Sequence, residues 1–211
     1  RLQGDWSSDV CSSDLADIAD ALCISGCCFS DVGDHREAII NHTLSLDMYK
    51  RIYGEDSDHP NIAAVLSNLG NDCEAMKEYT KAEEYFRLSL DMYKRIHGED
   101  SDHPDIAVVL NNLGHNHYNM EEYSKAEEYY RLALEMRKRI HGEDSDHPKI
   151  AVVLNNIGNN YHYIEEYTKA EEYYRLSLDM YKRIHGEDSD HPHIAIALRA
   201  LGMTYDAMEE I

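Results

Sequence analysis

The chain has 211 residues and a formal net charge of −21. A surface this acidic repels phosphate groups, so neither nucleic acid nor a membrane is expected as a partner. No apolar run approaches the roughly 20 residues of a membrane-spanning helix, and the cysteines suit reduced thiols in a cytoplasmic protein better than a disulfide framework.

The first residues differ in composition from everything that follows. Residues 4–15 read GDWSSDVCSSDL and hold the only tryptophan of the chain. They lack the basic and apolar regions of a secretory signal. Residues 5–15 resemble the conceptual translation of a common sequencing adapter, and every residue fits. We therefore expect residues 1–15 to be a sequencing artefact without defined structure.

The rest of the chain, residues 16–211, is an internal repeat. The heptapeptide GEDSDHP occurs four times, and its proline recurs every 44 residues, at Pro60, Pro104, Pro148 and Pro192. A fixed period of this length indicates an array of stacked units. The predicted units are residues 15–58, 59–102, 103–146 and 147–190, followed by a half unit at 191–211. Because that half unit has no second helix, we expect the chain to be a fragment of a longer array.

Each unit is predicted to form two helices, and no strand pattern is found in the sequence. In the unit 103–146, Pro104 suits the first position of a helix, and residues 106–120 carry apolar residues at helical spacing. Residues 121–142 form the second helix, with a candidate capping box at Ser124 and Glu127, and with Gly142 as its C-terminal cap. A glycine recurs inside each first helix, which indicates close approach of a neighbouring helix.

The pattern of small and aromatic residues resembles the tetratricopeptide repeat. In one unit it comprises Ile157, Gly158, Tyr161, Ala170, Tyr174 and Ser177. The motifs HPDIA and LNNLG and the long second helix resemble kinesin light chain repeats more narrowly. The resemblance implies an all-α, right-handed superhelical solenoid of antiparallel helix pairs. It also implies a non-catalytic scaffold for protein–protein interaction, with a concave groove that binds peptide segments of partners. A kinesin heavy chain is a further implied partner, through a region that is missing here.

The divergence between units indicates where a peptide would bind. The second helices are nearly identical, whereas the first helices differ after their glycine. Asparagine both donates and accepts hydrogen bonds, so a ladder of asparagines can satisfy an extended peptide backbone. The alternative is that these are solvated polar positions that drifted after duplication. The predicted peptide-binding residues are Ser67, Asn71, Asn111, His115, Tyr118, Asn119, Asn155, Asn159, His162, Tyr163 and Arg199.

No cofactor, metal site or catalytic residue is expected. The HGEDSDH segment lacks the ligand spacing of calcium or zinc sites and is predicted to be a solvated loop. Cys23, Cys27 and Cys28 could form a thiol site with His35, but buried packing cysteines in a helix are the favoured interpretation. A second hypothesis for the whole chain is the ligand-sensing repeat array of a larger signalling NTPase.

Overall fold

The computed structural model describes residues 12–187 and 189–209, and every regular element among them is a helix. They form two compact units, one ending at Glu99 and the other beginning at Asp100. No helix in the described ranges is both long enough and apolar enough to cross a bilayer. The helices are α1 (Ser12–Asp31), α2 (His35–Tyr53), α3 (Pro60–Ala75), α4 (Tyr79–His97), α5 (Pro104–Asn119), α6 (Tyr123–His141), α7 (Pro148–Tyr163), α8 (Tyr167–His185) and α9 (Pro192–Glu209).

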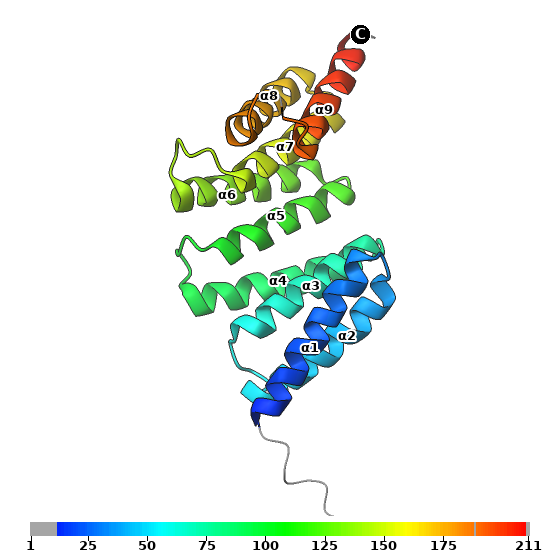
Figure 1. Ribbon diagram of the computed structural model, residues 1–211, viewed down its shortest axis with the longest axis vertical. Coiled ribbons are helices and arrows are strands. Elements are labelled where there is room, and N and C mark those ends of the chain that lie inside the picture. Colours follow the sequence, from blue (N-terminus) through cyan, green and yellow to red (C-terminus); the bar gives the residue numbers. More distant parts are fainter. Residues whose placement is uncertain (1–11, 188, 210–211) are drawn as a thin grey trace, which may run out of the picture. The chain divides into compact units, whose positions relative to one another are not determined.

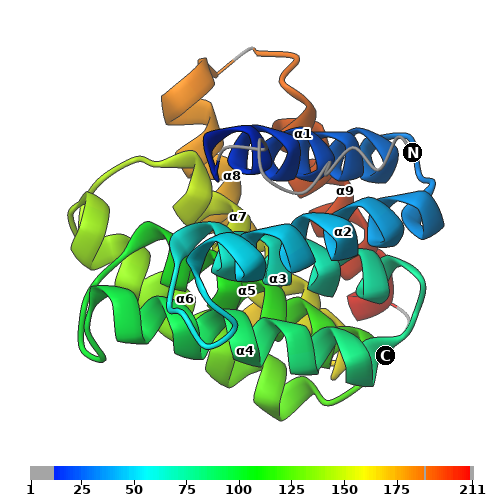
Figure 2. The ribbon, with the colours of Figure 1, turned by 90° about the horizontal axis from the view of Figure 1, so that it is seen from below.

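The first unit consists of the pairs α1–α2 and α3–α4, and α2 also packs against α3. Figure 1 shows α1 and α2 side by side, and Figure 2 shows the same for α3 and α4. Its core includes Leu46, Tyr49, Ile62 and Leu69, which are buried together. These side chains recur at helical spacing, so each helix presents one apolar stripe to its neighbours.

The second unit repeats this arrangement with the pairs α5–α6 and α7–α8 and with α9 packed against α8. The first helices of its repeats are also neighbours, because α7 contacts both α5 and α9. The prediction of an all-α array of helix pairs is therefore confirmed.

The repeated glycines lie where two helices of a pair come closest. A Cβ atom added to Gly114 would lie 2.6 Å from a ring carbon of Tyr130, and one added to Gly158 would lie 2.7 Å from a ring carbon of Tyr174. Both distances are shorter than a van der Waals contact, so only glycine leaves room for the buried ring. The expected close approach is confirmed at these positions.

The helix ends correct one prediction and reveal a cap that we did not predict. Helix α6 begins at Tyr123, two residues before a helix capped by Ser124 would begin, so Glu122 precedes it and no side chain caps it. Ser124 then lies inside the first turn, and the predicted capping box is wrong. The first helices are capped by histidine instead: the Nδ1 atom of His103 accepts a hydrogen bond from the Asp105 N–H at 3.3 Å. Gly142 ends α6 with a φ of 102°, a conformation that favours glycine.

The acidic loops between repeats are held in place rather than merely solvated. Arg139 on α6 donates to both carboxylate oxygens of Asp102 at 2.9 Å, and Arg183 on α8 makes the same pair with Asp146. His141 also stacks on His147 across its loop, with ring centroids 3.6 Å apart. The arginine pairs therefore tie each of these loops to the second helix of the repeat that follows it. The histidine stack closes the loop between α6 and α7.

The N-terminal segment and the cysteines differ from expectation. Helix α1 begins at Ser12, so residues 12–15 are helical although we expected structure only from Ala16, and Asp14 favours the helix by its position in the first turn. Residues 1–11 lie outside the described residues, and the adapter origin of the segment stays a prediction. Cys27 and Cys28 are exposed, which contradicts their expected burial.

Candidate functional site

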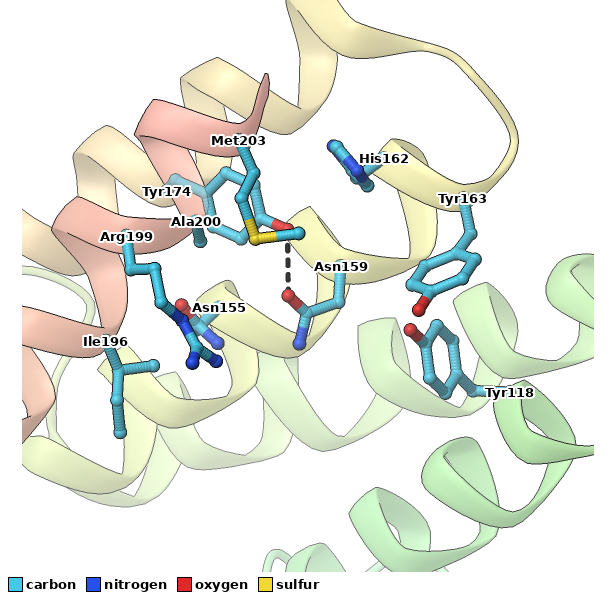
Figure 3. A pocket seen from close by; sticks show the side chains of 10 residues that line it. All are labelled: Tyr118, Asn155, Asn159, His162, Tyr163, Tyr174, Ile196, Arg199, Ala200 and Met203. Carbon is cyan, nitrogen blue, oxygen red and sulfur yellow. Dashed lines mark hydrogen bonds between the residues drawn. The ribbon is translucent and has the colours of Figure 1, made fainter. Parts of the chain in front are cut away.

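Most of the predicted peptide-binding residues of the second unit line one pocket. The pocket has a volume of about 200 Å³ and is formed mainly by α7 and α9, with contributions from α5 and α8. Figure 3 shows its lining residues, which are Tyr118, Asn155, Asn159, His162, Tyr163, Tyr174, Ile196, Arg199, Ala200 and Met203. The predicted residues among them are Tyr118, Asn155, Asn159, His162, Tyr163 and Arg199.

Helical spacing explains why α7 supplies the centre of this pocket. Asn155, Asn159 and His162 are separated by four and three residues, which places them on one face of the helix. The opposite face of α7 carries Val153 and Ile157, which are buried in the core of the unit. The apolar stripe therefore directs the polar face toward the pocket.

The two asparagines present different hydrogen-bonding groups. The Asn159 Oδ1 atom accepts a hydrogen bond from the Tyr174 hydroxyl at 2.8 Å, so the amide is oriented and its NH₂ group points away from that bond (Figure 3). Burial raises the pKa of Tyr174, which keeps the hydroxyl protonated as a donor. The Asn155 Oδ1 atom is buried and has no hydrogen-bond partner among the described residues. A buried acceptor without a donor costs free energy, which a ligand N–H group would recover.

Aromatic rings form one end of the pocket. The rings of Tyr118 and Tyr163 meet edge to face, with centroids 5.2 Å apart, and Tyr163 also stacks on Tyr123 of α6 at 6.3 Å. Burial, and next a hydrogen bond with Tyr163, raise the pKa of Tyr118. The sequence did not identify Tyr123 as part of the site. The neighbouring second helices, α4 and α8, also begin with a tyrosine, so this position does not vary between repeats.

The other end of the pocket carries a positive charge next to apolar groups. Arg199 is exposed on α9, and its guanidinium group extends toward Asn155 (Figure 3). No carboxylate lies within ion-pair distance of Arg199 among the described residues. Ile196 and Met203 are on the same helix and are 44% and 54% exposed. His162 has a different role, because its Nδ1 atom lies 3.1 Å from the Thr204 hydroxyl and thereby links α7 to α9.

The remaining predicted residues lie outside the pocket lining. The Asn111 Oδ1 atom accepts a hydrogen bond from Asn156 at 3.1 Å, so this side chain joins α5 to α7. His115 and Asn119 contact each other at 3.3 Å on α5. Ser67 and Asn71 belong to α3 in the other unit, and Ser67 is buried, so it cannot offer the contact surface that we predicted.

The lining combines several kinds of polar group with apolar side chains. It includes amide, phenol, imidazole, guanidinium and apolar groups, but no carboxylate, thiol or aliphatic hydroxyl. Such groups provide donors, acceptors and flat contact area.

The comparisons with known proteins agree with this fold. BtubC (BKLC) from P. vanneervenii is similar in structure with a TM-score of 0.77 and 21% identity, over 93% of this chain and 75% of that one. A putative kinesin light chain from Podosopora anserina, with nearly identical repeats, aligns with a TM-score of 0.72 and 15% identity over 93% and 89%. The apo form of RapI aligns with a TM-score of 0.72 and 19% identity over 91% and 64%. No curated protein matches the sequence.

The family comparison covers nearly all of the repeat array. The family described as "Tetratricopeptide repeat" matches residues 17–95, 61–139, 105–183 and 150–211. These overlapping matches advance by one repeat at a time and include the buried glycine–aromatic pairs described above. The chain belongs to the tetratricopeptide repeat family.

Proposed function

We propose that this chain is a non-catalytic scaffold that binds an extended peptide segment of a partner protein along the exposed faces of α5, α7 and α9. The observation that carries the proposal is the pocket itself, in which Asn155 and Asn159 lie between a tyrosine pair and Arg199. The buried, unpartnered Asn155 Oδ1 atom suits a peptide N–H group, and the Asn159 NH₂ group suits a peptide carbonyl. An extended backbone offers both groups in alternation.

The two ends of the pocket indicate the side chains of the peptide. The edges and faces of Tyr118 and Tyr163 suit a large apolar or aromatic residue. Arg199 suits a carboxylate, which can accept two hydrogen bonds from one guanidinium group. The chain as a whole has a net charge of −21, so it attracts peptides that carry basic residues outside the segment bound in this pocket. The ligand is therefore a net basic peptide with one acidic and one large apolar residue.

A role as a motor-associated cargo adaptor in the cytoplasm is the corresponding biological proposal. It is supported by the structural likeness to a putative kinesin light chain and by the repeat motifs. A kinesin heavy chain would then join through a region outside these residues.

The proposed function is tested by selecting ligands from a random peptide library displayed on phage. We expect the selected peptides to combine an acidic residue with a large apolar one. Amide hydrogen exchange with the best peptide then locates the site: protection should increase on α7 and α9 and stay unchanged on the exposed face of α6. Peptides that protect α6 instead would show that the binding surface is elsewhere, and a library without any enriched sequence would contradict peptide binding.

Tyr174→Phe is expected to weaken peptide binding several-fold without a loss of helix content. Phenylalanine occupies the corresponding position at Phe86, where it is fully buried beside Gly70, so the ring fits the fold. The variant removes only the hydroxyl that orients the Asn159 amide, and a net hydrogen bond is worth about 0.5–1.5 kcal/mol. Calorimetric titration of the selected peptide measures the effect. An unchanged affinity would show that Asn159 needs no orienting partner.

A further inference from the structure

A cluster of metal-ligating side chains lies between α1 and α2, away from the pocket described above. Cys23 and Cys27 are four residues apart on α1, so their thiols share one face of the helix. His42 on α2 faces them, with its Nε2 atom 3.7 Å from the Cys27 Sγ atom. The three potential ligand atoms all lie within 4.8 Å of one another.

The imidazole of this cluster is held in the form that a metal requires. His42 is buried, and its Nδ1 atom donates a hydrogen bond to the buried Asp72 carboxylate at 2.8 Å. This bond places the proton on Nδ1 and leaves the lone pair of Nε2 directed at the thiols. Burial alone would raise the pKa of Asp72, but hydrogen bonds from His42, Ser30 and His35 outweigh it and lower that pKa. A carboxylate that orients a ligating histidine in this way is a common feature of zinc sites.

The sulfur atoms also have a hydrogen-bond donor. The Asn68 Nδ2 atom lies 3.8 Å from the Cys23 Sγ atom and 3.6 Å from the Cys27 Sγ atom. An N–H group at this distance stabilises a thiolate once its proton has left. The cluster therefore has both ligands and the groups that would support them.

The other repeats show that this combination is particular to the first one. We compared Cys23, Cys27, His42 and Asp72 with the residues 44 positions later in the chain. Those residues cannot together bind a metal of this kind; they are Ser67, Asn71, Phe86 and Asn116. His42 occupies the place of the buried ring and leaves room only for glycine at Gly26, as Phe86 does at Gly70. A histidine is not needed to fill this space, because phenylalanine and tyrosine fill it elsewhere. All four departures favour ligation and they converge at one point.

We propose that Cys23, Cys27 and His42 bind one zinc ion, with water as the fourth ligand. Zinc–sulfur and zinc–nitrogen bonds of about 2.3 and 2.0 Å in a tetrahedron place the two ligand atoms about 3.5 Å apart. The 3.7 Å between Cys27 Sγ and His42 Nε2 matches this separation. Each thiol releases its proton to solvent on binding, and the exposed side of Cys27 gives the ion and the water access.

A thiol next to a histidine that is held by a carboxylate, as in Cys27, His42 and Asp72, also occurs in enzymes with a cysteine nucleophile. The backbone around Cys27 argues against a catalytic role here. Cys27 lies within the continuous helix α1, where the backbone N–H groups are engaged in the helix. These backbone N–H groups therefore cannot form an oxyanion hole for an acyl intermediate. The second thiol, Cys23, has no role in such a mechanism, whereas it completes the ligand set for a metal.

The test is a titration of the reduced, metal-free chain with Co²⁺, followed by displacement with Zn²⁺. We expect one ion per chain, thiolate-to-cobalt charge-transfer absorption in the near ultraviolet, and loss of both on addition of Zn²⁺. Asp72→Asn removes only the supporting carboxylate and should weaken binding about 10–100-fold. Loss of a ligand should cost more than that, so we expect a loss of more than about 100-fold in each of Cys23→Ser, Cys27→Asn and His42→Phe.

Each variant introduces the residue that the chain itself carries 44 positions later, so the variants should keep the helix content of the parent. Cys28→Ser is the matched control, because Cys28 is an exposed thiol next to the cluster and outside it. Absence of charge-transfer absorption in the parent chain would overturn the proposal. So would an equal loss of affinity in Cys28→Ser and Cys27→Asn, or tight binding that survives His42→Phe.

Discussion

Gly158→Ala is expected to destabilise the chain, although alanine is the better helix former. The new Cβ atom would lie 2.7 Å from ring carbons of Tyr174, which is itself buried and cannot move aside. Overpacking of this kind costs about 1–3 kcal/mol, and the gain in helix propensity returns at most about 1 kcal/mol. Adding Gly114→Ala, which meets Tyr130 at 2.6 Å, should roughly double the loss. Urea unfolding followed by circular dichroism measures the change.

Gly202→Ala provides a matched control of opposite sign. Gly202 holds the corresponding position in α9, but a Cβ atom there would have nothing within 4 Å. The substitution therefore gains helix propensity without a clash and should stabilise α9 by up to about 1 kcal/mol. If Gly158→Ala and Gly202→Ala changed stability in the same direction, the close approach of the paired helices would not be the reason for these glycines.

Much of the fold could be predicted from the sequence because the repeat makes local signals reinforce one another. Pro104 and Gly142 act within a few residues of their own position, and each recurs with the same period. The helix starts were less accurate because capping depends on backbone geometry. At Glu121 the turn adopts a φ of 61°, and Gly33 holds the equivalent place in the first repeat. A glutamate does not indicate a positive φ in the way that a glycine does, so the conformation at Glu121 could not be predicted from the sequence.

The candidate site was predicted only in part, because its geometry depends on contacts between distant residues. Periodicity placed Asn155 and Asn159 on one helix face correctly. It could not show that Asn156, on an adjacent face, engages Asn111 across 45 positions of the chain. Nor could it show that His42, rather than His35, would face the cysteines, because that depends on how α1 packs against α2. Divergence between repeats indicates which positions vary, and only packing decides which of them remain available to a ligand.

Asn155→Ala combined with Asn159→Ala is expected to weaken binding of a selected peptide about 30-fold or more. Each truncation leaves a peptide group without its partner, which costs about 1–3 kcal/mol when that group is buried, and about 1.4 kcal/mol corresponds to tenfold in affinity. The melting temperature should change little. Asn155 Oδ1 has no partner to lose among the described residues, and Asn159 loses a bond to the Tyr174 hydroxyl at the pocket.

The matched control is Glu128→Ala combined with Glu172→Ala. Both glutamates are exposed on second helices, one repeat apart, and neither lines the pocket. Removing two negative charges slightly raises the affinity for a ligand with an acidic group. Because these charges are exposed, salt screens this effect and it should be small. Calorimetric titration in 150 mM salt compares the two pairs. A loss of affinity in the glutamate pair with no loss in the asparagine pair would place the binding surface on the second helices. A large drop in melting temperature for the asparagine pair would mean that these side chains hold the helices together, and the divergence of the first helices would then have to be explained by packing.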